Sequence, residues 1–177
     1  IDRRLQTLEG TAPPVTASAG TASGFGGGPG ASAATAAGGP VVAAPGAGGA
    51  AERASYQAAF DLLKEGRYEQ ARAGFEKFLA EYPGSDLAGH SQYWLGETYY
   101  VTQKYDQALA AFQKAVNQYP QSRKLPDALL KVGYCRYELG QYVEARAALN
   151  TVLERFPEST AARLAGQRLD RMQSEGR

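Results

Sequence analysis

The sequence is poor in the side chains on which many enzyme and metal sites depend. Its 177 residues include one cysteine and one histidine. A single cysteine excludes an internal disulfide, and a single histidine excludes a metal site built on a histidine pair. No base is evident beside Cys135, so we interpret it as a buried structural thiol and His90 as a polar helix residue. We therefore expect no enzyme activity, and no catalytic, cofactor-binding or metal-binding residue.

Long apolar runs and a strong charge of either sign are also missing. No apolar stretch approaches the roughly 20 residues that a membrane-spanning helix needs. Residues 52–177 carry 17 basic and 16 acidic side chains, which gives no electrostatic reason to expect nucleic acid or an anionic membrane as partner. The sequence starts at Ile1 without an initiator methionine or a signal-peptide pattern, so we expect a fragment or a processed form.

The first 51 residues have little that would form a core. Residues 10–51 hold no charged side chain but 12 glycines and five prolines, a composition that predicts a flexible, disordered Gly/Ala/Pro linker. Before it, Ile1, Leu5 and Leu8 follow the four-and-three spacing of a heptad seam. Residues 1–9 are therefore either a frayed helix stub or the end of a coiled-coil oligomerisation segment.

Residues 52–177 repeat with a period of 37. Tyrosine recurs at Tyr68, Tyr105 and Tyr142, and five unrelated residue types keep the same register. A fixed period of this length indicates stacked supersecondary units. The other recurring positions are Ala71, Ala108 and Ala145; Phe75, Phe112 and Leu149; Pro83, Pro120 and Pro157; and Ser85, Ser122 and Ser159.

Each unit divides into two amphipathic helical stretches, which predicts an all-α domain. The first stretches run about 52–65, 88–102 and 125–139, and the second about 68–81, 105–118 and 142–155. Gly66 and Gly140 would end first helices in the left-handed conformation, and Gln103 takes that place less favourably. The repeats therefore span about 52–87, 88–124 and 125–159.

A final helix is expected at about 160–174. Ala161, Leu164, Ala165, Leu169 and Met172 would cover the open end of the third repeat, as the capping helix of a solenoid does. The charged side chains between them are expected to face water. These are Arg163, Arg168, Asp170 and Arg171.

The repeating unit resembles the tetratricopeptide repeat. The middle unit carries the motif best, the third has Arg136 where a tyrosine is expected, and the first has Ala59 in place of a glycine. The family's usual period is 34, so we place three extra residues in the turn after each proline. The resemblance implies a short right-handed solenoid that binds other proteins. The matching residues of the middle unit are Leu95, Gly96, Tyr99, Ala108, Phe112, Ala115 and Pro120.

The whole chain is similar to the YbgF/CpoB family of periplasmic Tol–Pal-associated proteins. The similarity lies in the Gly/Ala linker, the Tyr-Pro repeat endings and the segment from Trp94 to Tyr100. It implies a periplasmic location and a homotrimer formed by an upstream coiled coil. It also implies that TolA is a partner, and that the protein coordinates peptidoglycan synthesis with outer-membrane constriction in cell division.

In such a solenoid the first helices line the concave side, so equivalent positions along them would form a partner-binding groove. Aromatic side chains are favoured at binding hot spots. Packing between repeats is the alternative role for each tyrosine, and the bound segment could be helical or extended. The candidate groove residues are Arg53, Tyr56, Phe60, His90, Tyr93, Glu97, Tyr100, Asp127, Leu130, Tyr134 and Tyr137.

Two other functions compete with this interpretation. Similar long-period repeats form a scaffold subunit of outer-membrane protein assembly machinery, but such proteins would place a lipidated cysteine close before the repeats. The long uncharged segment 10–51 argues against that arrangement. A third hypothesis, in which the repeats regulate or carry an enzymatic activity, has no catalytic residues to support it.

Overall fold

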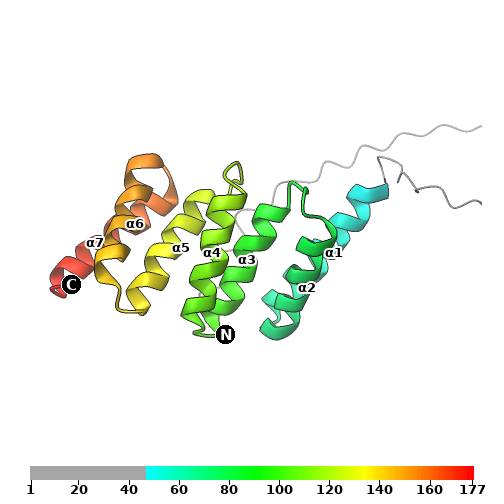
Figure 1. Cartoon of the computed structure of the whole chain (residues 1–177), viewed down its shortest axis with the longest axis horizontal. Helices are drawn as coiled ribbons and strands as arrows, with labels where there is room; N and C mark the ends of the chain where they lie inside the picture. Colours follow the sequence, from blue (N-terminus) through cyan, green and yellow to red (C-terminus); the bar gives the residue numbers. More distant parts are fainter. Residues whose placement is uncertain (1–46) are drawn as a thin grey trace, which may run out of the picture. The chain divides into compact units, whose positions relative to one another are not determined.

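The computed structural model describes residues 47–177, which form seven α-helices and no strand (Figure 1). The expected stub at 1–9 and the linker up to residue 46 lie outside this range. The all-α prediction is confirmed. No helix of the described range is long and apolar enough to cross a membrane. The helices are α1 (Ala47–Lys64), α2 (Tyr68–Glu81), α3 (Ala88–Val101), α4 (Tyr105–Gln118), α5 (Leu125–Glu138), α6 (Tyr142–Arg155) and α7 (Thr160–Ser174).

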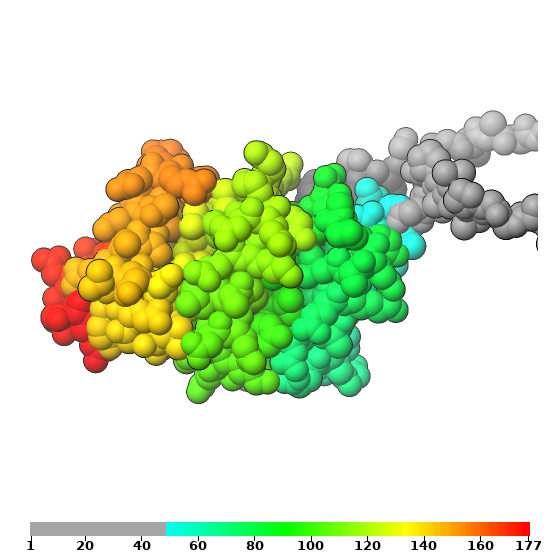
Figure 2. All heavy atoms as spheres, in the orientation of Figure 1, coloured from blue at the N-terminus to red at the C-terminus, as the bar shows by residue number. Residues whose placement is uncertain are grey.

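The helices stack as three antiparallel pairs with α7 at the end. Each helix packs on the next, and the pairs follow one another in contact from α1 to α7 (Figures 1 and 2). The first helices also touch along the stack, α1 with α3, α3 with α5 and α5 with α7. Among the described helices, α2, α4 and α6 do not touch one another. The stack is therefore tighter on the side of the first helices, which places them on its concave side.

A residue with a positive φ angle lies in the turn between the two helices of each pair. Gly66 and Gly140 have φ of +75° and +74°, and Gln103 adopts φ 59° at the equivalent place. Glycine reaches this conformation without a Cβ penalty, whereas glutamine pays one. The predicted role of all three residues is confirmed. Between pairs, the chain takes the longer turns 82–87 and 119–124, where we expected the extra residues of each period.

The first helix starts earlier than the sequence analysis expected. The linker was expected to continue to residue 51, but α1 begins at Ala47. Alanine has the highest helix propensity, and helix growth costs little once a turn has formed. The alanines at 50 and 51 favour this extension, although the glycines at 48 and 49 do not, and the first fully buried residue of α1 is Ala59.

The core alternates small and large side chains, as the repeat pattern predicted. Phe112 on α4 is fully buried, and a Cβ built on Gly96 of α3 would lie 2.6–2.8 Å from three of its ring atoms. Gly133 of α5 stands in the same relation to Leu149 of α6, at 2.7 Å. The motif glycines are therefore needed because two helices approach closely there, each over a large buried side chain.

The serines that recur after the prolines have two roles. Ser159 is the N-cap of α7, and its hydroxyl accepts a hydrogen bond from the Ala162 amide at 3.0 Å. Ser85 and Ser122 sit one turn earlier, where their hydroxyls accept from the Leu87 and Lys124 amides and close local turns. Short polar side chains satisfy otherwise unpaired amides in both settings.

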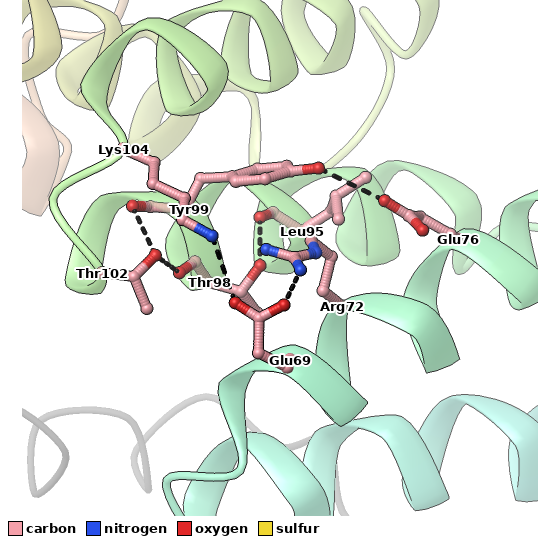
Figure 3. A network of polar contacts seen from close by, with 8 residues as sticks. All are labelled: Glu69, Arg72, Glu76, Leu95, Thr98, Tyr99, Thr102 and Lys104. Atoms are coloured by element: carbon pink, nitrogen blue, oxygen red, sulfur yellow. Dashed lines mark hydrogen bonds and ion pairs between the residues drawn. The ribbon is translucent and has the colours of Figure 1, made fainter.

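A surface network joins the first repeat to the second (Figure 3). Glu69 of α2 pairs with Arg72 of the same helix and with the ammonium of Lys104, 3.2 Å away. The Arg72 guanidinium lies 5.1 Å from the Tyr99 ring centroid, and the Tyr99 hydroxyl donates to Glu76 at 3.3 Å. Exposed ion pairs of this kind contribute little singly, so the network fixes orientation more than it adds stability.

Candidate functional site

We call the surface formed by α1, α3, α5 and α7 the inner face. The candidate groove residues lie on its first three helices, but they differ in burial. Tyr93 and Leu130 are only 5% and 3% exposed, and the Tyr93 ring packs 5.5 Å from Phe112. In this structure these two side chains belong to the core. Tyr56, Phe60, Tyr100, Tyr134 and Tyr137 remain partly exposed and are the aromatic candidates that a partner would reach.

The α1 end of the inner face is an aromatic cluster. The indole N–H of Trp94 donates to the Tyr56 hydroxyl at 2.9 Å, and the Phe60 ring packs 5.1 Å from Trp94. Burial raises the pKa of Tyr56 to about 12, against a smaller lowering by the Trp94 bond. Lys64 extends over Phe60, 5.5 Å from its centroid. The ammonium of Lys64 also pairs with Asp61 at 2.8 Å, so the apolar surface of this end is the partly exposed Phe60 ring beside an ion pair.

An ion pair occupies the centre of the inner face. The Lys131 ammonium lies 2.7 Å from Oε1 and 3.0 Å from Oε2 of Glu97, and both side chains are largely shielded from water. The same ammonium lies 4.6 Å from the Tyr100 ring centroid. Glu97 was proposed from sequence as a partner contact, but its charge is already neutralised by α5. In this structure the pair links α3 to α5.

The α7 end combines tyrosines with arginines. The Arg168 guanidinium lies 4.4 Å from the Tyr134 centroid and 4.7 Å from that of Tyr137. The Tyr137 hydroxyl hydrogen-bonds Glu175 and accepts from Arg177. Arg168, which was expected to face water, is only partly exposed because its guanidinium packs on these rings. It shares the side of α7 that carries Ala165 and Met172, both fully buried, so the helix directs it onto α5.

Arg53, His90 and Asp127, three of the candidate groove residues, do not form one cluster. Arg53 is exposed on α1, whereas Asp127 pairs with the Lys124 ammonium at 3.2 Å. His90 is partly buried, and burial, followed by the charges of Lys124 and Arg123, lowers its pKa. The lowered pKa favours the neutral imidazole. Only His90 and Asp127 share a charged neighbourhood, through Lys124.

Sequence analysis did not identify three cations of this surface as site residues. Lys124, Lys131 and Arg168 each lie over at least one aromatic ring, with Lys124 5.3 Å from the Tyr93 centroid. The signal for Arg168 was present, because residues 161, 165, 168 and 172 fall on one helix face. Nothing in the spacing of Lys124 or Lys131 distinguishes them from solvated lysines.

The side chains of the inner face are suited to binding a partner rather than to chemical reaction. Cys135 is fully buried in α5, as expected, and burial raises the pKa of its thiol to about 12, which keeps it protonated. Within residues 47–177 no group of three or more histidine, cysteine, aspartate or glutamate side chains is placed to hold a metal ion.

Buried tyrosines make the fold sensitive to alkali. Besides Tyr56, burial raises the pKa of Tyr93, Tyr99 and Tyr100. Tyrosine in an unfolded chain ionises near pH 10, so between about pH 10 and pH 12 the unfolded state binds fewer protons than the folded state. We expect the free energy of unfolding to fall as pH rises through that window. Urea titrations at successive pH values, with tyrosinate absorbance, would measure it.

The variant Tyr56→Phe provides the comparison for the alkaline effect. Its unfolding free energy should decline less steeply above about pH 10, because one of the shifted groups is gone. A free energy of unfolding that stays constant through the window would contradict the prediction.

Two tetratricopeptide repeat family models match the chain, one over residues 56–123 and the other over residues 103–168. Together they extend from the second half of α1 to the first part of α7. The predicted repeat type is therefore confirmed.

A curated relative matches a shorter stretch at higher identity. The Cell division coordinator CpoB of Pseudomonas putida is 50% identical over 48 residues, which are 27% of this chain and 18% of the relative. The chain thus matches less than a fifth of the relative's length. The match supports the YbgF/CpoB resemblance in part, for that segment.

Solved structures share the fold at low identity. The second repeat domain of human RPAP3, determined with an HSP70 peptide, has a TM-score of 0.56 at 22% identity, covering 68% of this chain and 97% of that one. The Arabidopsis OM64 domain gives 0.58 at 19%, with 69% and 96% covered. The Saccharomyces cerevisiae co-chaperone Cns1 gives 0.63 at 19%, with 73% and 41% covered. These likenesses establish the fold alone.

Proposed function

We propose that this chain, whose residues 56–168 are tetratricopeptide repeats, is a non-enzymatic module that binds a segment of a partner protein on its inner face. The observation that carries the proposal is the set of tyrosines left partly exposed there, in a fold that buries most of its large apolar side chains. Tyr100 and Tyr137 occupy equivalent positions of successive repeats, and each packs 5.5 Å from the next tyrosine of its own pair, Tyr105 or Tyr142. Such rigid aromatic edges bind with little loss of side-chain entropy.

The biological setting that we propose is the periplasm. The similarity to CpoB favours a role in coordinating cell division, in which the repeats bind TolA and link peptidoglycan synthesis to outer-membrane constriction. An upstream coiled coil would make the protein a homotrimer. Three tethered inner faces would then raise the effective concentration of the module near its partner. The same similarity favours this role over an outer-membrane assembly scaffold.

The test is a calorimetric titration of the periplasmic part of TolA into the full chain and into the double variant Tyr100→Ala/Tyr134→Ala. We expect the double variant to bind at least about tenfold more weakly, since truncating aromatic hot-spot residues removes most of their contact area. Tyr93 is left intact because its burial against Phe112 makes its replacement a test of folding.

Val143→Ala provides the matched control, because Val143 is 79% exposed on α6, away from the inner face. It should bind TolA like the wild-type chain, and circular dichroism should show all three proteins folded. No heat of binding with the wild-type chain would exclude TolA as the direct partner. Equal affinity of the double variant and the wild type would exclude the inner face as the binding surface.

A further inference from the structure

Arg168 is a charged residue on a helix face that otherwise packs in the core. It lies between Ala165 and Met172 on α7, and both of these side chains are fully buried. Its guanidinium rests on the rings of Tyr134 and Tyr137 from α5. The charge of Arg168 also opposes the rise in the pKa of Tyr100, which places it within electrostatic reach of α3. The group therefore belongs to the inner face.

Arg168 differs from the neighbouring cations in having no acidic partner. Lys131 pairs with Glu97, Lys124 with Asp127, and Arg171 with Glu175. Within the described part of the chain, no carboxylate lies at ion-pair distance from Arg168. Stacking on tyrosine rings uses the flat face of a guanidinium and leaves its N–H groups, which point outward in the plane, free to donate. A partly desolvated guanidinium with N–H groups free to donate matches a carboxylate in shape and charge.

We propose that Arg168 determines partner specificity by binding a carboxylate of an acidic partner segment that lies along the inner face. The proposal rests on the proposed function, because it assigns the chemistry of the bound segment. The two ends of the face then impose a direction on that segment. Apolar residues meet Phe60, which packs on the buried Trp94, at the α1 end, and an aspartate or glutamate meets Arg168 at the α7 end. The neighbouring tyrosines hold the guanidinium in place before the segment binds.

The probe is a phage-displayed library of random peptides of about 12 residues, long enough when extended to cross several helices. It is selected in parallel on the wild-type chain and on Arg168→Met, which keeps the stem over the rings and removes the charge. We expect the wild-type chain to enrich peptides with an aspartate or glutamate at a fixed distance from an apolar pair. Synthetic copies should bind Arg168→Met at least about tenfold more weakly.

Two further variants separate this role from a structural one. Arg163→Met removes an exposed arginine from the same helix and should leave the affinity of the peptides unchanged. Arg168→Lys keeps the charge without the planar fork, and should give an intermediate affinity with a salt dependence like that of the wild type. In Arg168→Met the salt dependence of peptide binding should be weaker.

The outcomes distinguish the specificity of Arg168 from the binding function. Enriched peptides that lack an acidic residue, but lose binding in Tyr100→Ala/Tyr134→Ala, would overturn the role of Arg168 and leave the inner face as the binding surface. If the peptides bind the wild-type chain and Arg168→Met with equal affinity, the role of Arg168 is also overturned, and the inner face remains the binding surface. Failure to enrich any peptide, or enriched peptides indifferent to the double tyrosine variant, would overturn both proposals.

Discussion

Replacing Phe112 with alanine should lower the free energy of unfolding by about 3–5 kcal/mol, the range found when a buried aromatic side chain is deleted. The Phe112 ring is fully buried. It lies against the backbone of Gly96 on one side and the Tyr93 ring on another. Because two helices approach over this one side chain, the surroundings cannot collapse into the cavity without moving α3. Urea unfolding followed by far-ultraviolet circular dichroism measures the loss.

A substitution at Gly96 tests the same contact from the other side. Gly96→Ala alone places a methyl group 2.6–2.8 Å from the Phe112 ring and should destabilise the fold by about 1–3 kcal/mol. In the Phe112→Leu background the added methyl group has room, and its cost should shrink or vanish. Val143→Ala, at a surface position, should stay within about 0.5 kcal/mol of the wild type. A strictly additive result at positions 96 and 112 would contradict the packing described here.

The helix pattern could be predicted from sequence because local residues determine where each helix ends. Proline cannot continue a helix, and Pro83, Pro120 and Pro157 recur every 37 residues. Gly66 and Gly140, two periods apart, adopt the positive φ that closes a first helix, so both signals mark the units. The start of α1 has no such marker. Residues 47–51 are only alanine and glycine and carry no capping signal, so the start was placed five residues too late, at 52 instead of Ala47.

The candidate site was harder to predict because its character depends on contacts between distant residues. Tyr93 and Tyr100 look equivalent in sequence, yet Tyr93 is almost fully buried and Tyr100 is not. The Lys131–Glu97 pair joins positions 34 residues apart, and the Trp94–Tyr56 hydrogen bond joins positions 38 apart. The period places such residues in neighbouring repeats. The period does not determine which side chain is buried or which lysine pairs with a carboxylate.

The central ion pair is expected to give the second large stability effect. Lys131→Met should lower the free energy of unfolding by about 2–4 kcal/mol, because it leaves the Glu97 carboxylate shielded from water without a counter-charge. The side chains of Lys131 and Glu97 are only 19% and 12% exposed, so solvent cannot replace the lost partner. The contact of the ammonium with the Tyr100 ring is lost as well. Chemical denaturation of the purified variant measures the effect.

The double variant Lys131→Met/Glu97→Leu decides whether the loss comes from a stranded charge or from the pair itself. If the stranded charge dominates, removing both charges should recover most of the stability, since apolar side chains of similar volume replace buried ion pairs at little cost. Lys77→Met is the matched control, because Lys77 is 69% exposed and lies 3.8 Å from Glu81, and it should change stability by less than about 0.5 kcal/mol. A double variant as unstable as Lys131→Met would instead show that the pair itself stabilises the packing of α3 against α5.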